Sequence, residues 1–145
     1  MNLDSLRLNV SSGMVVAARQ WRRLCHSALT GYGISEACAM PLLMIVRLGD
    51  GVHQVAVAQA AGLEGPSLVR LLDQLCNAGL VRRSADPHDR RAKALSLTAS
   101  GRTLAESIEQ ELVRLRRAAL KDIDQADLEA TLRVLRAFET AGGAL

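Results

Sequence analysis

A dense group of arginine side chains lies between Pro66 and Arg102. This stretch contains seven cations and three anions, a balance of +4, whereas the whole chain carries only +3. A guanidinium group can donate two hydrogen bonds to a phosphate, or to the O6 and N7 atoms of a guanine. Positive charge that is concentrated in one segment is what attraction to the phosphates of a duplex requires. A solvated charged loop is the alternative interpretation.

The segment from Pro66 to Gly79 is predicted to be a helix, because proline is tolerated in a first helical turn and glycine commonly ends a helix. Its core-facing side would consist of Leu68, Leu71, Leu72 and Leu75. On the opposite side, Arg70 would read a guanine in the major groove. Ser67 and Gln74 would hold phosphates or neighbouring bases. A surface helix whose polar face meets only water is the alternative.

Two strands, Leu80–Ser84 and Ala94–Leu97, are expected to flank the turn-rich basic loop ADPHDRRAK. Within that loop the carboxylate of Asp89 is predicted to brace the guanidinium of Arg91, which lies two residues further on. A braced arginine at a hairpin tip fits the narrow, electronegative minor groove of A·T-rich DNA. Arg90 and Lys93 are expected to contact phosphates.

The other elements, which must position these residues, are predicted from the helical repeat of apolar side chains. The repeat predicts helices over Asn9–Leu29, Ser35–Leu48, Val55–Ala61, Thr98–Leu115 and Gln125–Phe138. Ser35 and Thr98 are suited to be N-caps. Pro41 should kink the second helix or delay its start, because it removes an amide donor. The tight turn GLEG joins the third helix to the one that begins at Pro66, which makes a helix-turn-helix.

The predicted fold is mainly α with a small β-wing. The chain is expected to be one domain, 1–145, with a winged helix-turn-helix over about 34–102 and dimerisation helices over about 3–30 and 103–145. These flanking helices are amphipathic and have no intrachain partner large enough to cover them. We therefore expect a homodimer, which would place two reading helices at a fixed separation on a pseudo-palindromic operator.

Composition favours a cytoplasmic protein that is neither secreted nor embedded in a membrane. The first residues lack a signal-peptide pattern, and no apolar run approaches the length of a membrane span. The odd, widely spaced set Cys25, Cys38 and Cys76 argues against a disulfide framework. No zinc spacing, nucleophile elbow, phosphate loop or paired-carboxylate signature appears. We therefore predict no enzyme activity, no catalytic residue, no metal and no cofactor.

The strings GLEGPSLVRLLDQLCNAGLVRR and DPHDRRAKALSLTASG resemble the MarR family of winged-helix regulators, and within it the SlyA-type branch. The D-x-R and L-T-x-x-G elements carry this resemblance, which covers about 55–104. It implies a dimer with Arg70 in the major groove and a wing, bearing Asp89 and Arg91, in the minor groove. It further implies repression of efflux or stress-response genes that is relieved by a small aromatic carboxylate or an oxidant.

The resemblance also implies an effector pocket where the first two helices meet the winged domain. Its candidate residues are Arg19, Trp21, Arg22, Ser35, Cys38 and Met44. An arginine near an aromatic ring could hold a carboxylate by a charge-assisted hydrogen bond. Ala39, however, stands near the place where the SlyA branch usually carries an aromatic residue. An ordinary hydrophobic junction is therefore the alternative interpretation.

Two further hypotheses remain open. Cys25 lies two residues after an Arg-Arg pair and beside His26, a setting that partly fits a redox-active thiolate. The peroxide-sensing members of the family carry their cysteine nearer the start of the first helix, so a structural thiol is the alternative. A winged helix that is used only for protein contacts is the second hypothesis, because a fold alone does not dictate function.

Overall fold

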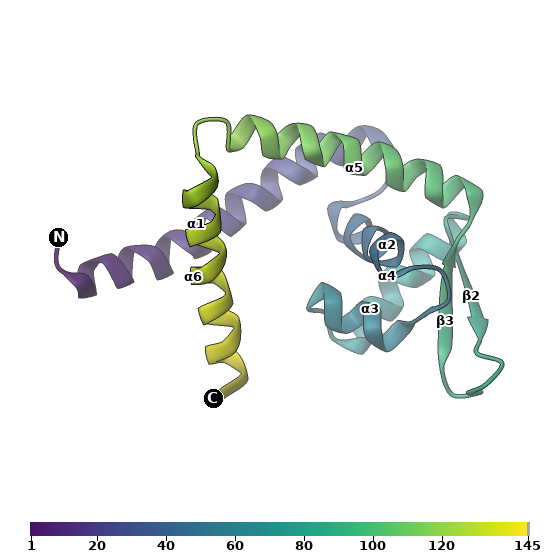
Figure 1. The fold of residues 1–145 in the computed structure, drawn as a ribbon. Helices are drawn as coiled ribbons and strands as arrows, with labels where there is room; N and C mark the ends of the chain where they lie inside the picture. Colours follow the sequence, from purple (N-terminus) through teal and green to yellow (C-terminus); the bar gives the residue numbers. More distant parts are fainter. Residues whose placement is uncertain (145) are drawn as a thin grey trace. The chain divides into compact units, whose positions relative to one another are not determined.

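The computed structural model describes residues 1–144, which form two compact units, residues 1–112 and residues 113–144. The first unit contains α1 (Leu3–Leu29), the 3₁₀ turn η1 (Thr30–Tyr32), α2 (Glu36–Leu48), β1 (Val52–His53), α3 (Gln54–Ala61), α4 (Gly65–Asn77), β2 (Val81–Ala85), β3 (Lys93–Leu97) and the first part of α5 (Ala99–Ala119) (Figure 1). The second contains the rest of α5 and α6 (Gln125–Ala144). The mainly α fold with a small β-wing is confirmed. The single domain 1–145 stays a prediction, and its last residue lies outside the described residues.

The core of the first unit is aliphatic, as the scarcity of aromatic residues predicts. Its most deeply buried side chains are Leu29, Leu42, Ile45, Val57, Leu68, Leu72, Leu75, Leu95 and Ile108. They come from α1 to α5 and from β3, so each element contributes one apolar face to the same interior. Among residues 1–144 no single helix is long and apolar enough to cross a membrane, and only the bent pair 3–32 plus 36–48 would pass by length and composition.

The start of α1 differs from the prediction. The helix begins at Leu3, not at Asn9, because the side chain of Asn2 caps it and accepts a hydrogen bond from the backbone N–H of Ser5 at 2.8 Å. The apolar residues of its first turns, such as Leu3 and Leu6, are exposed. The core-facing apolar repeat therefore indicates only the later, buried part of this helix.

The helix α2 runs through Pro41. Ser35 is its N-cap, as predicted, and Ser35 Oγ accepts from the backbone N–H of Cys38 at 3.2 Å. Of the two predicted effects of Pro41, the delayed start is wrong, because the helix begins at Glu36 directly after its cap, and the kink stays a prediction. Proline removes one backbone hydrogen bond here, but its ring is buried together with the inward face of α2, and this packing offsets the loss.

The sheet has three strands rather than the two that were predicted. In the order β1-β3-β2, all neighbours are antiparallel, with Val52 opposite Leu95 and Val81 opposite Leu97. The two residues of β1 are too few to show an alternating pattern in the sequence. Because β1 pairs with β3 and leads directly into α3, this short strand fixes the start of α3 beside β3.

A close contact fixes the base of the hairpin to the end of α4. Thr98 Oγ1 donates to the carbonyl oxygen of Gly79 at 2.6 Å and accepts from the backbone N–H of Gly101 at 3.0 Å. A side chain at Gly101 would overlap the carbonyl group of Leu80. The L-T-x-x-G element is thus the place where the start of α5 crosses the chain between α4 and β2, and only glycine fits there.

Candidate nucleic-acid interface

The predicted helix-turn-helix is present, with α3 ending at Ala61 and α4 beginning at Gly65 after three intervening residues. The apolar face of α4 is buried, and its leucines are those that the sequence indicated. Arg70 and Asn77 lie on the opposite, exposed face, whereas Ser67 is half-buried and Gln74 is exposed. The chain reverses after α4 at Gly79, whose φ of 73° is in the left-handed region that favours glycine.

Neighbouring elements hold both flanks of α4. On one flank, Arg83 of β2 donates from an NH2 group to Asp73 Oδ1 at 2.9 Å. On the other flank, the buried thiol of Cys38 in α2 donates to Gln74 Oε1 at 3.2 Å. Sequence reasoning missed both contacts, because a helical repeat does not show which distant residue a polar side chain meets. The two contacts orient the exposed face of α4 between them.

The hairpin β2–β3 with its tip, residues 81–97, is called the wing below. Hydrogen bonds order its tip at Asp86, which accepts from the backbone N–H of His88 at 2.7 Å and lies 2.5 Å from His53 Nε2 of β1. These bonds, that from His88 first and that from His53 second, hold the pKa of Asp86 below its usual value of 3.8. Ala92 closes the tip through backbone hydrogen bonds to Asp86 and Asp89. The wing is therefore an ordered projection that is tied to β1.

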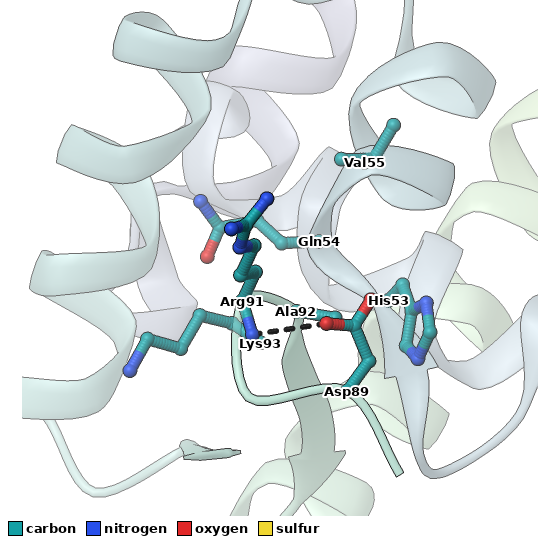
Figure 2. Close-up of a pocket in the computed structure, with 7 residues that line it drawn as sticks. All are labelled: His53, Gln54, Val55, Asp89, Arg91, Ala92 and Lys93. Atoms are coloured by element: carbon teal, nitrogen blue, oxygen red, sulfur yellow. Dashed lines mark hydrogen bonds between the residues drawn. The ribbon is translucent and has the colours of Figure 1, made fainter. Parts of the chain in front are cut away.

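The predicted brace between Asp89 and Arg91 has a different form. Asp89 Oδ1 accepts from the backbone N–H of Arg91 at 3.0 Å, which Figure 2 marks with a dashed line, and within residues 1–144 the Arg91 guanidinium has no ion-pair partner. The prediction of a side-chain brace is wrong because an aspartate closes a turn readily onto the backbone amide two residues ahead. Asp89 thus fixes the backbone of the tip and leaves the guanidinium available.

A cleft of about 340 Å³ separates the wing from the first turn of α3. It is lined by His53, Gln54, Val55, Asp89, Arg91, Ala92 and Lys93 (Figure 2). Arg91 and Lys93 of the wing and Gln54 of α3 therefore line the same cleft. Gln54 was not among the predicted site residues, and its polar side chain at the very start of α3 was the signal that could have identified it.

The remaining predicted DNA-contacting residues are cations on α4 and the wing, and their contacts with DNA stay a prediction. Arg70, Arg90, Arg91 and Lys93 are exposed, and none pairs with a carboxylate in the described part of the chain. The exposed side chain of Arg82 on β2 joins them, although it was not predicted as a contact. The interface thus combines one helix face and one hairpin, both with unpaired cations.

The predicted effector-pocket residues lie in different settings, and their role in binding an effector stays a prediction. Arg19 and Arg22 are exposed on α1 and Trp21 is half-buried, whereas Cys38 and Met44 lie in the core. Ser35 is engaged as the cap of α2. None of these six residues lines either of the two clefts described for residues 1–144, which lie between the wing and α3 and between α2 and α5. The alternative interpretation, an ordinary hydrophobic junction, fits Cys38 and Met44.

The predicted redox candidate is also in an unexpected place. Cys25 is 6% exposed and, with Leu29, forms the buried end of α1, so the exposed setting expected of a sensor thiol is absent. Its position on the core-facing side of the helix explains the burial. Within residues 1–144, no group of three or more His, Cys, Asp or Glu side chains is placed to hold a metal ion.

Comparisons with known proteins agree on one family. Residues 32–92 match the family model described as the MarR family. The transcriptional regulator PA3341 is 34% identical, with a TM-score of 0.85 over 94% of this chain and 99% of that chain. A MarR-family regulator from Rhodococcus sp. RHA1 is 26% identical, with a TM-score of 0.72 over 95% of each chain. CouR from Rhodococcus jostii RHA1, solved with p-coumaroyl-CoA, is 26% identical, with a TM-score of 0.74 over 94% of this chain and 92% of that chain.

Proposed function

We propose that this chain, which belongs to the MarR family of DNA-binding transcriptional regulators, binds a pseudo-palindromic operator as a homodimer and represses transcription. The observation that carries the proposal is the pair of projections described above. The exposed face of α4 and the ordered wing bear cations that have no ion-pair partner in residues 1–144. Hydrogen bonds from Cys38 and Arg83 hold α4, and a hydrogen bond to Asp89 holds the tip of the wing. Such rigid, cationic elements suit a duplex, whose phosphates supply most of the binding free energy.

Each cation has its own role in the proposed complex. Arg70 lies on the outermost face of α4 and reads a guanine in the major groove. Arg91 extends from the wing toward the minor groove, where the negative potential of A·T-rich DNA is strongest. Arg90 and Lys93 neutralise phosphates. Gln54 is added to the predicted set, because it shares a cleft with Arg91 and Lys93 that is large enough to admit a phosphate group.

Exposed apolar side chains on the terminal helices support the proposed homodimer. On α1 they are Leu3, Leu6, Leu8, Val10, Val15 and Val16, and on α6 they are Leu132, Val134, Leu135 and Phe138. Soluble proteins seldom leave so many large apolar side chains in water on one helix, unless another surface covers them. A second copy of the chain would bury these faces, and it would also supply the second DNA-reading helix.

We further propose that the regulator represses efflux or stress-response genes. A small phenolic or aromatic carboxylate would relieve this repression. CouR, a relative at 26% identity, was solved with p-coumaroyl-CoA, the thioester of a phenolic acid. In this chain the exposed guanidinium groups of Arg19 and Arg22 on α1 supply charge for an anionic effector. The burial of Cys25 gives the thiol-sensing alternative no support.

The experiment is a titration of full-length protein with a labelled duplex selected from a random library, at several salt concentrations. Affinity should fall steeply as salt rises, and Arg91→Ala should weaken binding by about tenfold or more. Lys93→Ala should make the slope of log affinity against log salt concentration shallower, by the amount expected for the loss of about one phosphate contact. The controls are Arg117→Ala and Lys121→Ala, which remove exposed cations outside the interface. Absence of duplex binding at low salt would refute the proposal, as would a protein that sediments as a monomer.

A further inference from the structure

One side-chain contact joins the start of the helix-turn-helix to the tip of the wing. His53, the last residue of β1 and the one directly before α3, places its Nε2 atom 2.5 Å from Asp86 Oδ2. The side chain of Asp86 is 18% exposed, whereas that of His53 is 46% exposed and can exchange a proton with solvent. The contact therefore couples two projections that must engage a duplex together, and one of its two partners is a titratable ring.

Asp86 carries this contact to both sides of the tip. Its Oδ1 atom accepts from the backbone N–H of His88, and its own backbone N–H donates to the carbonyl oxygen of Ala92. The segment between these bonds contains Arg91. The hydrogen bonds of Asp86, that from His88 first and that from His53 second, hold its pKa below the usual 3.8. The carboxylate therefore stays ionised near neutral pH, where an imidazole changes its charge.

The other charged groups around the His53 ring come from the wing. Asp89, Arg91 and Lys93 line the same cleft as His53 (Figure 2). The β3 residue opposite His53 is Ala94, and α3, with the sequence QVAVAQAA, has no charged side chain. Together with Asp86, two carboxylates and two cations thus surround the imidazole. Among these side-chain types, only imidazole ordinarily changes charge between about pH 5 and 8.

We infer that His53 is a positioning residue, which holds the tip of the wing in place for DNA binding through Asp86 and does so most firmly when its imidazole is protonated. The inference rests on the proposed function. Protonation converts a neutral hydrogen bond into a charge-assisted one between two ions, which is stronger. When the imidazole is neutral, a larger share of free molecules has the tip released. The apparent dissociation constant for DNA is then raised by the inverse of the seated fraction.

The sign of the pH dependence follows from this coupling. The stronger bond exists only while His53 carries its proton, so the added affinity is present at mildly acidic pH. It is lost as pH rises through the range in which an imidazole deprotonates. From about pH 5.5 to about pH 8.5, wild type should lose about two- to fivefold in duplex affinity, as expected for one exposed charge pair.

The test measures this pH profile with full-length protein and one duplex at fixed salt. His53→Gln retains a donor but cannot titrate, so its affinity should not vary with pH and should match that of wild type at the alkaline end. The chain has three histidines. The matched controls are therefore His26→Gln on α1 and His88→Gln at the tip, both at exposed positions, and both should keep the wild-type profile. A profile that survives in His53→Gln overturns the inference.

A second variant separates positioning from direct contact with DNA. Asp86→Asn keeps an oxygen for the backbone N–H of His88 but removes the negative charge that a protonated His53 meets. It should flatten the profile as His53→Gln does. If the profile persists in Asp86→Asn, the charge of His53 acts on the duplex itself, and the inference is overturned.

A readout without DNA keeps this inference separate from the proposed function. The backbone amide signals of Arg91 and Ala92, followed by NMR over the same pH range, should move in wild type and in His88→Gln. They should stay fixed in His53→Gln and in Asp86→Asn, whose spectra also show that the variants are folded. Fixed signals in wild type, or a duplex affinity that does not vary with pH, overturn the inference and leave the proposed DNA binding intact. Absence of duplex binding at low salt instead refutes the proposed function, and this inference with it.

Discussion

The buried thiol of Cys38 lies 3.2 Å from Gln74 Oε1 and joins the first turn of α2 to the exposed part of α4. Because the thiol donates to the amide oxygen, Gln74 turns its amide nitrogen outward. A glutamine that binds adenine in the major groove uses its oxygen and its nitrogen together. The contact with Cys38 therefore makes Gln74 mainly a donor, suited to phosphates or to acceptor atoms on bases.

Replacing Cys38 should change the base preference of the regulator. In Cys38→Ala the amide oxygen is released, so duplexes with adenine opposite Gln74 should gain about 1 kcal/mol, a several-fold change in relative affinity. Cys38→Ser retains a donor and should keep the wild-type preference. Sequencing of duplexes selected from a random library measures both. Identical base preferences for Cys38→Ala and wild type would show that the thiol does not orient Gln74. That outcome would not contradict the proposal that the protein binds DNA.

Arg82 and Arg83 are adjacent on β2 but should respond differently to substitution. Arg82 is exposed and makes no ion pair with any residue in the described range 1–144, so Arg82→Ala should remove about one phosphate contact from the salt dependence of DNA binding. Arg83 is held by Asp73, so Arg83→Ala should weaken binding with little change in that dependence. Fluorescence anisotropy across a salt series distinguishes the two. Equal losses of salt dependence would mean that Arg83 leaves Asp73 and contacts DNA.

The sequence predicted the parts of the interface that depend on local pattern. The leucine repeat of α4, the stop at Gly79 and the alternation within β2 and β3 are all properties of neighbouring residues. The contacts of Cys38 with Gln74 and of Arg83 with Asp73 could not be predicted in this way. Each depends on how separate elements pack, and a polar side chain on a helix has the same sequence signature whether it meets water or another element.

Gly101 should be among the positions least tolerant of substitution. In Gly101→Ala the new methyl group meets the backbone carbonyl of Leu80, which cannot move without disturbing the strand that follows. The free energy of unfolding should fall by about 1 to 3 kcal/mol, as for other overpacked sites. Gly13→Ala, in open space on α1, should instead be stabilising, because alanine favours helix. Urea unfolding measures both, and a neutral Gly101→Ala would contradict the close approach.

The carboxyl group of Asp86 should make the wing sensitive to acid. Its pKa in the folded protein lies below the usual 3.8, so its hydrogen bonds stabilise the fold above that pH and are lost as pH falls through the lower, folded value. Asp86→Asn should lose this acid-side dependence, because an amide accepts a hydrogen bond without titrating. The amide proton signal of His88, followed by NMR from neutral pH to about pH 2, reports the transition. A wild-type signal that does not move over this range would contradict the expectation.

The role of Asp89 can be resolved by two substitutions that differ in charge and hydrogen bonding. The Asp89 side chain accepts from the backbone of Arg91, so the property that matters is an acceptor oxygen at this position. Asp89→Asn keeps that oxygen and should retain nearly full DNA affinity, whereas Asp89→Ala removes it and should weaken binding several-fold because the tip of the wing loses its turn. A brace that acts on the guanidinium by charge would make the asparagine variant as weak as the alanine variant. Equilibrium binding to one duplex at one salt concentration separates these outcomes, and the salt dependence should remain that of wild type in both variants because the guanidinium of Arg91 is still present.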